Sequence, residues 1–533
     1  MRVAVVMLVA IAVIATATPA SAAIIHVNET GWWFEGGSFN PSSTPIQSAV
    51  DAASDGDTIL IEAGSYEESV DIVDKAVSLI GNGTPDEVVI QSSGDVIYIS
   101  NQNPANSMVI SNLTVANGGW HNGILVENFN GNKSLGRVLT IRDLNVTKTR
   151  YGIVTTSGSR GITIERVGIN KSGWGIEVTG GSEVDRISDC YIEANTGIYI
   201  HMWYGHGHVY EIVNNRIKAE TGLDIRDINK EMLIANNFLQ GTNTQGSGIY
   251  IGWSNSVTVA NNIITGFGSG IYLHRSTQLT LANNSAAGNT YNFRIYGSDV
   301  SHYVHTIYSN NTLNEKPIYY YVGVSHATIP ANAGFIGIVS SNDVNANGFT
   351  ISENYDGLVV VNSSNVMLNG YIYNCKRGVY VWKSSNVVFE GRIYEAGGSG
   401  VRVLESQAEL RNAEIGSAGV DIDNSNVVFE NVTVGGNFNA GYIDSSTCRI
   451  ANSTFHRPLY LSDVTNSLIY NCSFNKELRL SGCENNTVTS CRFDCSGSCE
   501  CGIRIGRGSN NTVKQNEIQN FNKGINIYAS DSN

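Results

Sequence analysis

Residues 248–273, GIYIGWSNSVTVANNIITGFGSGIYL, contain one complete sequence repeat. Gly248 opens an alternating apolar segment, the pair Asn261-Asn262 ends a second one, and the phrase Gly-Ile-Tyr returns at Gly270. Short segments with apolar residues at every second position indicate half-buried strands, and no helical spacing separates them here. A repeat of 22 residues built from such strands is typical of a protein made of stacked coils.

The same repeat runs along most of the chain. Strands this short cannot bury an apolar face alone, whereas coils stacked about 4.8 Å apart form one continuous core. The asparagine pairs fit the corners, because Asn tolerates a left-handed backbone and its amide can bond to the Asn of the next coil. We assign the opening glycines to the same tight corners. These glycines are Gly123, Gly152, Gly175, Gly197, Gly222, Gly248 and Gly270, and, after a less regular stretch, Gly357, Gly378, Gly400, Gly419, Gly441, Gly502 and Gly524.

The chain divides into an export signal and one long repeat region. Residues 1–22 combine Arg2, an apolar run and the ending Ala-Ser-Ala, which is typical of a cleaved signal peptide. Residues 23–533 are expected to form a continuous β-helix, with a capping helix in 40–56, an irregular insertion at 312–345 and cysteine-rich coils at 448–501. No lid is visible after the last strand, so we expect either a partner that covers the C-terminal coil or a longer sequence.

Composition narrows the class of partner. The formal charge is −14 and only 15% of residues are charged, without a basic stripe, which argues against a nucleic-acid partner. An acidic chain also favours a neutral polymer over an anionic one, unless a local patch overrides the net charge. No segment after the signal is apolar enough for a transmembrane helix. We therefore expect a secreted, periplasmic or cell-surface protein.

Two phrases carry a resemblance to a known family. Residues 46–61 followed by Ala-Gly-Ser-Tyr at 63–66, and Asn-Glu-Lys-Pro-Ile-Tyr-Tyr-Tyr at 314–321, resemble proteins of the pectin-lyase-like superfamily with NosD-type or carbohydrate-binding and sugar-hydrolysis repeats. The resemblance implies an all-β, right-handed parallel β-helix with a short N-terminal capping helix and a polysaccharide site on an exterior face. It does not select an activity, since this superfamily contains lyases, hydrolases, epimerases, copper-chaperone relatives and surface proteins.

Outward positions of the glycine-led strands are expected to align in columns. In the pattern Gly-apolar-x-apolar-x, both x residues point outward. Their aromatic, charged and imidazole side chains are suited to stack on sugar rings and bond to hydroxyls, although such residues also suit a plain solvated sheet. The candidate carbohydrate-binding residues are Tyr199, Tyr250, Tyr272, His201, His274 and Arg294. The first column runs Glu177, Tyr199, Asp224, Tyr250, Tyr272, Arg294, and the second runs Thr179, His201, Arg226, Gly252, His274, Tyr296.

Catalysis is an alternative that the same face permits. A glycoside hydrolase needs two carboxylates roughly 5 to 10 Å apart, and a lyase needs a basic residue beside bound calcium. The candidates are Asp224 with Asp227, Glu177 with Asp224, and Asp421 with Asp423, with Arg226 as the base of a lyase. The Asn-Thr-Asp and Asp-Asp elements of polygalacturonases are missing from the sequence. We therefore favour a binding or scaffolding protein over a polysaccharide hydrolase or lyase.

Metal binding and disulfide formation are two further hypotheses. His201, His206 and His208 lie near Met202, a set that could bind copper or zinc as in a NosD-like protein, although a histidine-rich loop is often only polar surface. Seven of the nine cysteines lie between residues 448 and 501, where we expect disulfides that staple the terminal coils. The alternative for Cys472 and Cys491, which occupy equivalent places one coil apart, is stacking as small buried residues. An odd total leaves at least one thiol unpaired or bonded to another chain.

Overall fold

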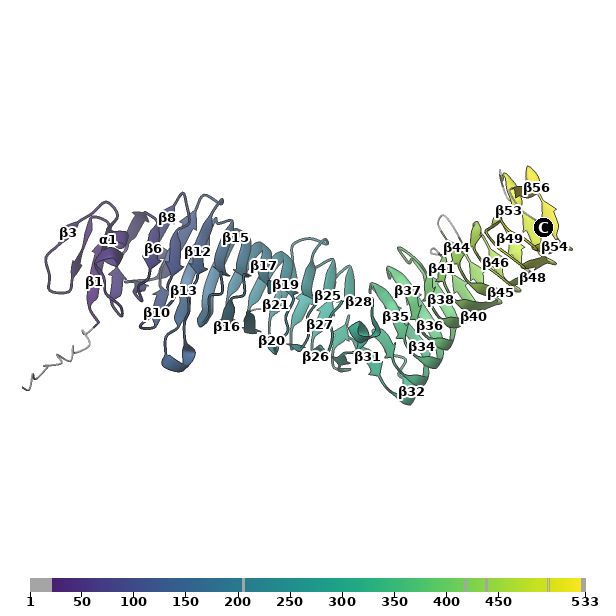
Figure 1. Ribbon diagram of the computed structural model, residues 1–533, viewed down its shortest axis with the longest axis horizontal. Helices are drawn as coiled ribbons and strands as arrows, with labels where there is room; N and C mark the ends of the chain where they lie inside the picture. Colours follow the sequence, from purple (N-terminus) through teal and green to yellow (C-terminus); the bar gives the residue numbers. More distant parts are fainter. Residues whose placement is uncertain are drawn as a thin grey trace, which may run out of the picture.

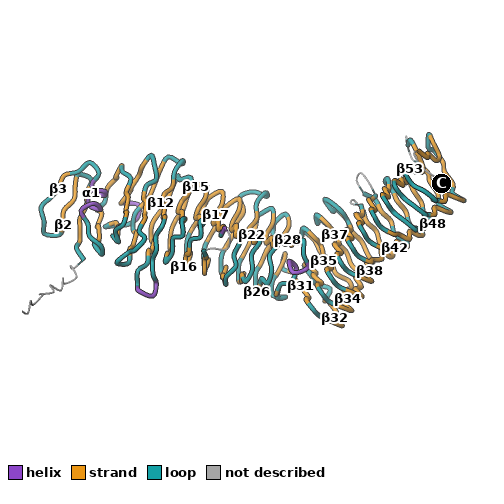
Figure 2. The backbone as a smooth tube through the Cα atoms, viewed as in Figure 1, coloured by secondary structure: helices purple, strands orange, loops and turns teal. Residues whose placement is uncertain are grey.

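The chain forms a right-handed parallel β-helix, as predicted. The computed structural model describes residues 22–203, 207–416, 419–436, 440–495, 497 and 499–528, so the predicted signal peptide lies almost wholly outside the described residues. Strands of successive coils pair in parallel over nearly the whole length, and Figure 2 shows them stacked with loops at the corners. Within the described residues, no helix is long and apolar enough to cross a membrane.

Each coil of the first half contributes strands to three faces. The glycine face carries the Gly-led strands, and some long strands turn a corner and serve two faces. The glycine face contains β6 (Val70–Val73), β9 (Ile97–Ser100), β12 (Asn122–Glu127), β14 (Tyr151–Thr156), β22 (Ser247–Gly252), β25 (Ser269–His274), β28 (Tyr291–Tyr296) and the ends of β15 (Ile162–Val178), β17 (Tyr191–His201) and β19 (Arg216–Arg226). The second face contains β1 (Ile24–Asn28), β4 (Thr58–Ile61), β7 (Ser78–Gly81), β10 (Met108–Ser111), β13 (Leu139–Thr147), β16 (Glu183–Ser188), β18 (His208–Val213), β20 (Met232–Ala235), β23 (Val257–Ala260), β26 (Thr280–Ala282) and β29 (Thr306–Ile307). The third face contains β5 (Gly64–Glu67), β8 (Val88–Ser92), β11 (Thr114–Asn117), β21 (Phe238–Gly241), β24 (Ile263–Thr265), β27 (Ser285–Ala287) and β30 (Thr312–Leu313).

The second half repeats this arrangement as a separate stack. Its glycine face contains β31 (Lys316–Val322), β33 (Phe335–Val339), β35 (Asp356–Val361), β37 (Arg377–Trp382), β39 (Val401–Leu404), β41 (Val420–Asp423), β44 (Gly441–Asp444), β47 (Leu459–Ser462), β50 (Leu478–Ser481), β53 (Cys501–Gly506) and β56 (Lys523–Tyr528). The other faces contain β32 (Ser325–Ile329), β34 (Asn342–Ser352), β36 (Ser364–Tyr373), β38 (Ser385–Tyr394), β40 (Gln407–Ile415), β42 (Asn426–Glu430), β43 (Thr433–Val434), β45 (Thr447–Ala451), β46 (Thr454–Phe455), β48 (Leu468–Tyr470), β49 (Ser473–Phe474), β51 (Thr487–Thr489), β52 (Arg492–Asp494), β54 (Thr512–Lys514) and β55 (Glu517–Gln519).

The predicted N-terminal cap is confirmed. Helix α1 (Pro45–Ala52) buries Ile46, Ala49 and Val50 against the first coil, beside an antiparallel ribbon of β1, β2 (Gly31–Phe34) and β3 (Asn40–Pro41). Thr44 precedes the helix but its side chain makes no capping bond. The buried Glu68 carboxylate accepts from the first helical N–H groups instead, at 3.1 Å from Ile46 and 2.9 Å from Gln47. A side chain from the adjacent coil therefore caps the N-terminus of the helix.

An asparagine ladder closes one corner of the first stack. The Asn215 amide donates to the Asn237 side-chain oxygen at 3.0 Å, and the bond repeats at 2.9 Å from Asn237 to Asn262 and from Asn262 to Asn284. Each of these side chains is buried, and each preceding Asn, such as Asn261 with φ +57°, has a left-handed backbone. The predicted role of the asparagine pairs is therefore confirmed. In the second stack a ladder of buried serines, which the sequence did not suggest, connects the coils through the backbone: the Ser363 N–H donates to the Ser384 hydroxyl at 3.1 Å.

The predicted role of the opening glycines is wrong. Gly197 and Gly222 lie inside strands and have no positive φ. A Cβ on Gly222 would instead lie 2.5 Å from the carbonyl oxygen of Gly248 and 2.8 Å from Leu239 Cδ2. These glycines are needed because the coils approach closely at this point, where no side chain fits.

The disulfide prediction is also wrong for most of the cysteines. One disulfide joins Cys495 to Cys499, and the other seven cysteines are free and buried. Cys472 and Cys491 lie in the core of the second stack, 3% and 2% exposed, which confirms the alternative that they stack. Both thiols face the apolar side chains of this core, so each acts as a small apolar side chain.

The two stacks meet at an angle (Figure 1), and the junction, here called the elbow, is formed by β31, β33, β35 and β37 of the second stack, which contribute side chains to both cores. Alternate residues of these strands belong to different cores: Leu358 and Val360 to the second, Val359 and Val361 to the first. Trp382 lies 5.9 Å from Tyr303 of the first stack, between ring centroids. The outward face of the second stack therefore closes the open end of the first. β31 and β33 of the elbow lie within the predicted irregular insertion at 312–345, and β35 and β37 follow it.

Candidate functional site

The two predicted columns are aligned on the glycine face of the first stack. Strand register places Tyr199 beside Asp224, Asp224 beside Tyr250, and Tyr250 beside Tyr272, with Arg294 next. The second column likewise runs through His201, Arg226, Gly252, His274 and Tyr296. Inward neighbours such as Ile198 and Ile249 are completely buried, so the alternation of apolar residues fixes which side chains point outward.

Hydrogen bonds fix the side chains around Tyr199 and Arg226 on this surface. The Tyr199 hydroxyl lies 3.0 Å from His201 Nδ1, and His201 Nε2 lies 2.9 Å from Asp227 Oδ2 on the next coil. Arg226 donates to both oxygens of Asp224 at 2.8 Å, and its guanidinium lies 5.8 Å from the Tyr199 ring and 5.3 Å from the Tyr250 ring. The charged groups of this region are thus paired and hold the aromatic rings in place.

A second cluster follows on the next coils. The Tyr250 hydroxyl lies 2.7 Å from His274 Nδ1, and the Tyr250 and Tyr272 rings are 5.2 Å apart at a steep angle. Arg294 lies 4.0 Å from the Tyr272 ring and 4.0 Å from the ring of Tyr355 in the second stack. The aromatic surface is therefore continuous from Tyr199 to the elbow.

Partial burial favours the neutral forms of the tyrosines and of His274 on this surface. Burial raises the pKa of Tyr250 to about 12, and it also raises the pKa of Tyr199 and Tyr272, so the hydroxyls stay protonated. Burial, followed by the nearby Arg275 and Arg294, lowers the pKa of His274 to about 4. A neutral His274 has one unprotonated ring nitrogen, so its Nδ1 can accept a hydrogen bond from the protonated Tyr250 hydroxyl. The result is a row of aromatic rings with hydrogen-bond donors and acceptors held in fixed positions.

Sequence reasoning missed several tryptophans that border the surface. Trp203 and Trp253 follow the outward residues of β17 and β22, are 58% and 45% exposed, and contact His201 and His274 at 4.4 and 4.5 Å. Trp253 has φ +50°, a strained conformation for a bulky side chain. Trp174, one residue before an opening glycine, packs 4.8 Å from Tyr199. Trp174 and Trp253 lie one residue outside the Gly-apolar-x-apolar-x pattern and Trp203 lies two residues outside it, and these positions were the available signal.

The predicted catalytic residues lie on the same surface. Glu177 and Asp224 flank Tyr199 on either side, two strands apart. Burial raises the pKa of Glu177, opposed by Arg150. Asp224 is held by Arg226, and Asp227 by His201, on the neighbouring corner. Asp421 and Asp423, the remaining pair, lie on β41 of the second stack.

The predicted metal ligands are only partly described. His206 lies outside the described residues. His201 contacts Asp227, whereas His208 begins β18 on the second face and lies 2.6 Å through Nε2 from the Glu231 carbonyl oxygen. Among the described residues, no group of three or more His, Cys, Asp or Glu side chains is arranged to hold a metal ion.

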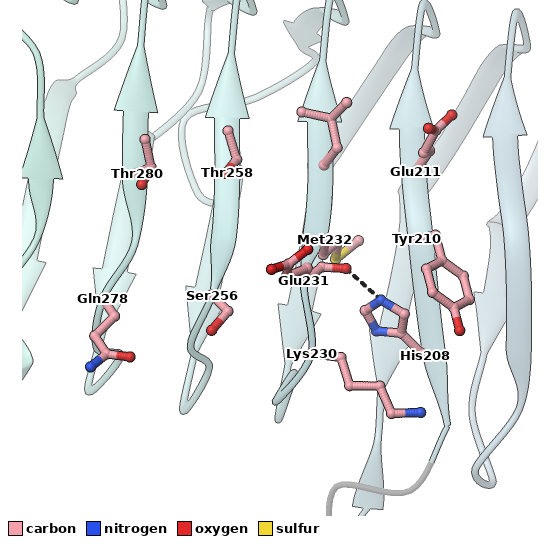
Figure 3. A pocket seen from close by; sticks show the side chains of 11 residues that line it. His208, Tyr210, Glu211, Lys230, Glu231, Met232, Ser256, Thr258, Gln278 and Thr280 are labelled. Atoms are coloured by element: carbon pink, nitrogen blue, oxygen red, sulfur yellow. Dashed lines mark hydrogen bonds between the residues drawn. The ribbon is translucent and has the colours of Figure 1, made fainter.

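A hollow of about 540 Å³ lies on the second face rather than on the aromatic surface (Figure 3). His208 and Tyr210 of β18 and Lys230 border one side of it, and Thr258 and Thr280 of the next strands border the other. Lys230 pairs with Glu183 at 3.2 Å, and burial lowers the pKa of His208. Neither candidate column contributes to this hollow.

The coil geometry agrees with a family assignment. The family model "Right handed beta helix region" matches residues 202–333 and 399–533, half of the chain. The chain belongs to this family. No protein of curated function matches the sequence significantly.

Solved structures with a similar course are carbohydrate-active enzymes. The catalytic domain of a GH87 α-1,3-glucanase in complex with nigerose is 14% identical, with 78% of this chain and 65% of that chain covered and a TM-score of 0.26. The PL6 family alginate lyase AlyGC is 10% identical, with 90% and 98% covered and a TM-score of 0.28. An alginate lyase from Paenibacillus sp. str. FPU-7 is 14% identical, with 66% and 94% covered and a TM-score of 0.25. This chain spans about two thirds of the glucanase, and at such identities and TM-scores the likeness does not extend to a site or an activity.

Proposed function

We propose that the protein is an exported β-helix that binds carbohydrate along the glycine face of its first stack. The observation that supports this most is the continuous surface of Tyr199, Tyr250 and Tyr272 with His201, His274 and Arg226 between them. Aromatic rings stack on the apolar faces of sugars, and fixed hydroxyl, imidazole and guanidinium groups bond to sugar hydroxyls. A surface kept only for solubility would not need its polar groups bonded to one another and its rings half-buried.

The length of the surface suits a chain of sugars rather than a single one. It extends over the six glycine-face strands from Glu177 on β15 to Arg294 on β28. At the usual strand spacing this is about 24 Å, the length of several sugar residues. A strip that crosses six strands also suits a polymer, which is held at several points along the sheet, better than it suits a small molecule.

Binding is tested on an array of neutral and acidic hexasaccharides. Tyr250→Ala and Tyr199→Ala each remove a ring at the centre of the surface, and we expect each to weaken binding about tenfold or more. Tyr308→Ala is the matched control, because Tyr308 is 54% exposed and follows β29 on another face. Equal binding by all four proteins, or by none, contradicts the proposal.

Polysaccharide cleavage is a second candidate that one observation favours. Burial raises the pKa of Glu177, as a general acid requires, and the Asp224 carboxylate on the other side of Tyr199 forms an ion pair with Arg226. Two strand spacings place them about 10 Å apart, near the upper end of the range for inverting hydrolases. Release of reducing ends that is lost in both Glu177→Gln and Asp224→Asn supports this activity. Release that persists in these variants, or no release by the native protein, rules out this pair.

A further inference from the structure

The second stack carries the same four residue types in the same order on its own glycine face. On the first stack, successive strands present Asp224, Tyr250, Tyr272 and Arg294 at equivalent outward positions. On the second stack, successive strands β41, β44, β47 and β50 present Asp421, Tyr442, Tyr460 and Arg479. Inward residues must be apolar for the coil to fold, but the fold places no such demand on the outward column. The repeated order therefore points to a shared role.

The two sets share the spacing of their tyrosine rings and an ion-paired aspartate, and they differ in the angle between the rings. The Tyr442 and Tyr460 rings are 5.2 Å apart, the same separation as Tyr250 and Tyr272. Each aspartate has an arginine partner, Asp421 with Arg402 of the preceding strand at 3.3 Å and Asp224 with Arg226 of its own strand at 2.8 Å. The second pair of rings lies nearly parallel, with an interplanar angle of 16°, and Tyr442 is 54% exposed. Two parallel rings on adjacent strands form a flat apolar platform.

The flanking column differs in charge between the two surfaces. Beside the first tyrosine pair it contributes Arg226 and His274. Beside the second it runs Asp423, Asp444, Ser462 and Ser481, so carboxylates and hydroxyls border the platform. Carboxylates accept hydrogen bonds from sugar hydroxyls and repel acidic sugars.

From these observations we infer a second carbohydrate-binding surface, formed by Tyr442 and Tyr460 with Asp423 and Asp444, that takes neutral polysaccharide. The inference rests on the proposed function of the first stack and extends it to a two-site protein. Sugar rings stack on the tyrosine platform while Asp423 and Asp444 accept from their hydroxyls. A polymer long enough to reach both surfaces gains affinity from the second contact.

The test compares two double variants on the hexasaccharide array. We expect Tyr442→Ala with Tyr460→Ala to weaken binding of neutral hexasaccharides about tenfold, and Tyr250→Ala with Tyr272→Ala to leave a residual neutral signal that the quadruple variant loses. Asp444→Asn adds a test of the flanking column. We expect this variant to bind neutral glycans more weakly and to discriminate less against acidic glycans. Tyr308→Ala remains the control. Thermal unfolding of each variant verifies that the coil is intact.

Each outcome assigns a failure to one proposal. If binding depends on Tyr250 and Tyr272 but no signal changes with Tyr442 and Tyr460, the second surface is overturned and the first stands. If neutral binding is lost only with Tyr442 and Tyr460, the second surface stands and the first is overturned. If the native protein binds no hexasaccharide, both are overturned. If a double variant unfolds, Tyr442→Phe with Tyr460→Phe is used instead, because it keeps the rings and removes only the hydroxyls. We expect this variant to retain binding, as a stacking role requires. Loss of binding in the folded variant overturns the stacking role.

Discussion

Single side chains hold the coils together at points that no strand pairing reaches. The buried amide of Asn262 donates to Asn284 and to the Ile234 carbonyl oxygen, while its own oxygen accepts from Asn237. A buried polar group without partners costs about 1 to 3 kcal/mol, and here each amide satisfies its neighbour in the next coil. The buried imidazole of His305 does the same at the end of the first stack. Its Nδ1 accepts from the Leu279 N–H, and its Nε2 lies 3.0 Å from the His302 carbonyl oxygen.

We expect His305 to make stability fall as the pH drops from about 6.5 to about 4. Burial lowers the pKa of His305 from its ordinary value to about 4. In that window the unfolded chain binds a proton that the folded chain excludes, so acid favours unfolding, by about 3 kcal/mol at the lower end. Chemical denaturation between pH 7.5 and pH 4 measures the effect, and His305→Asn should flatten the curve. The exposed His121 offers the control, and an unchanged slope in His305→Asn would contradict the assignment.

Strands on the glycine face combine a close contact between coils with a free outward row. Gly222 has no room for a methyl group, whereas the next residues alternate between the core and the ligand-facing side. The strand therefore fixes the position of a ring such as Tyr250 relative to its neighbours. An outward residue can be replaced without changing the packing of the core.

Gly222→Ala should destabilise the first stack by about 1 to 3 kcal/mol, because the added methyl group overpacks the contact with Gly248 and Leu239. Gly94→Ala is the matched control: its Cβ would meet nothing closer than 3.9 Å and its φ is not positive. The midpoint of denaturant unfolding measures both. A Gly222→Ala protein as stable as Gly94→Ala would mean that the coils can separate at no cost.

The sequence predicted the elements better than their reasons. Alternation of Ile and Val in the glycine-led strands was enough for the fold, the columns and the asparagine corners, because each is local and repeated. The close approach at Gly222 depends on the neighbouring coil, so it was mistaken for a corner. Trp203 and Trp253 were missed because they stand in loops outside the repeat. The second tyrosine pair was not predicted because no glycine opens the strand of Tyr460, which Pro458 and Leu459 precede, so the repeat pattern does not mark it.

At the scale of the whole molecule, the elbow joins two separate cores through shared strands. Val359 and Val361 face the first core while Leu358 and Val360 face the second. The buried ion pair of Asp356 and Arg377, 2.5 Å between Oδ1 and Nε, lies in the same strands. The angle between the stacks and the stability of the first stack are thus linked, because the same surface of the second stack forms the bend and covers the end of the first stack.

Val361→Asp should uncouple the stacks. It places a carboxylate at a completely buried position of the elbow, which costs several kcal/mol and favours separation of the two cores. We expect an additional, earlier transition in calorimetry and a wider distribution of shapes in small-angle scattering. Val73→Asp, at a 47% exposed outward position of β6, is the control. A single transition at the native temperature in Val361→Asp would show that the elbow does not bear on stability.

The side of one arm covers the end of the other, so the described part of the joint is formed by β31, β33, β35 and β37, at the start of the second stack. Coils inserted or removed between β12 and β22, or between β41 and β53, would change how far each arm reaches while leaving the joint untouched. The reach of the two arms and the angle between them are therefore independent variables, and related proteins of different length are expected to keep the bend while differing in the span of polymer that they cover.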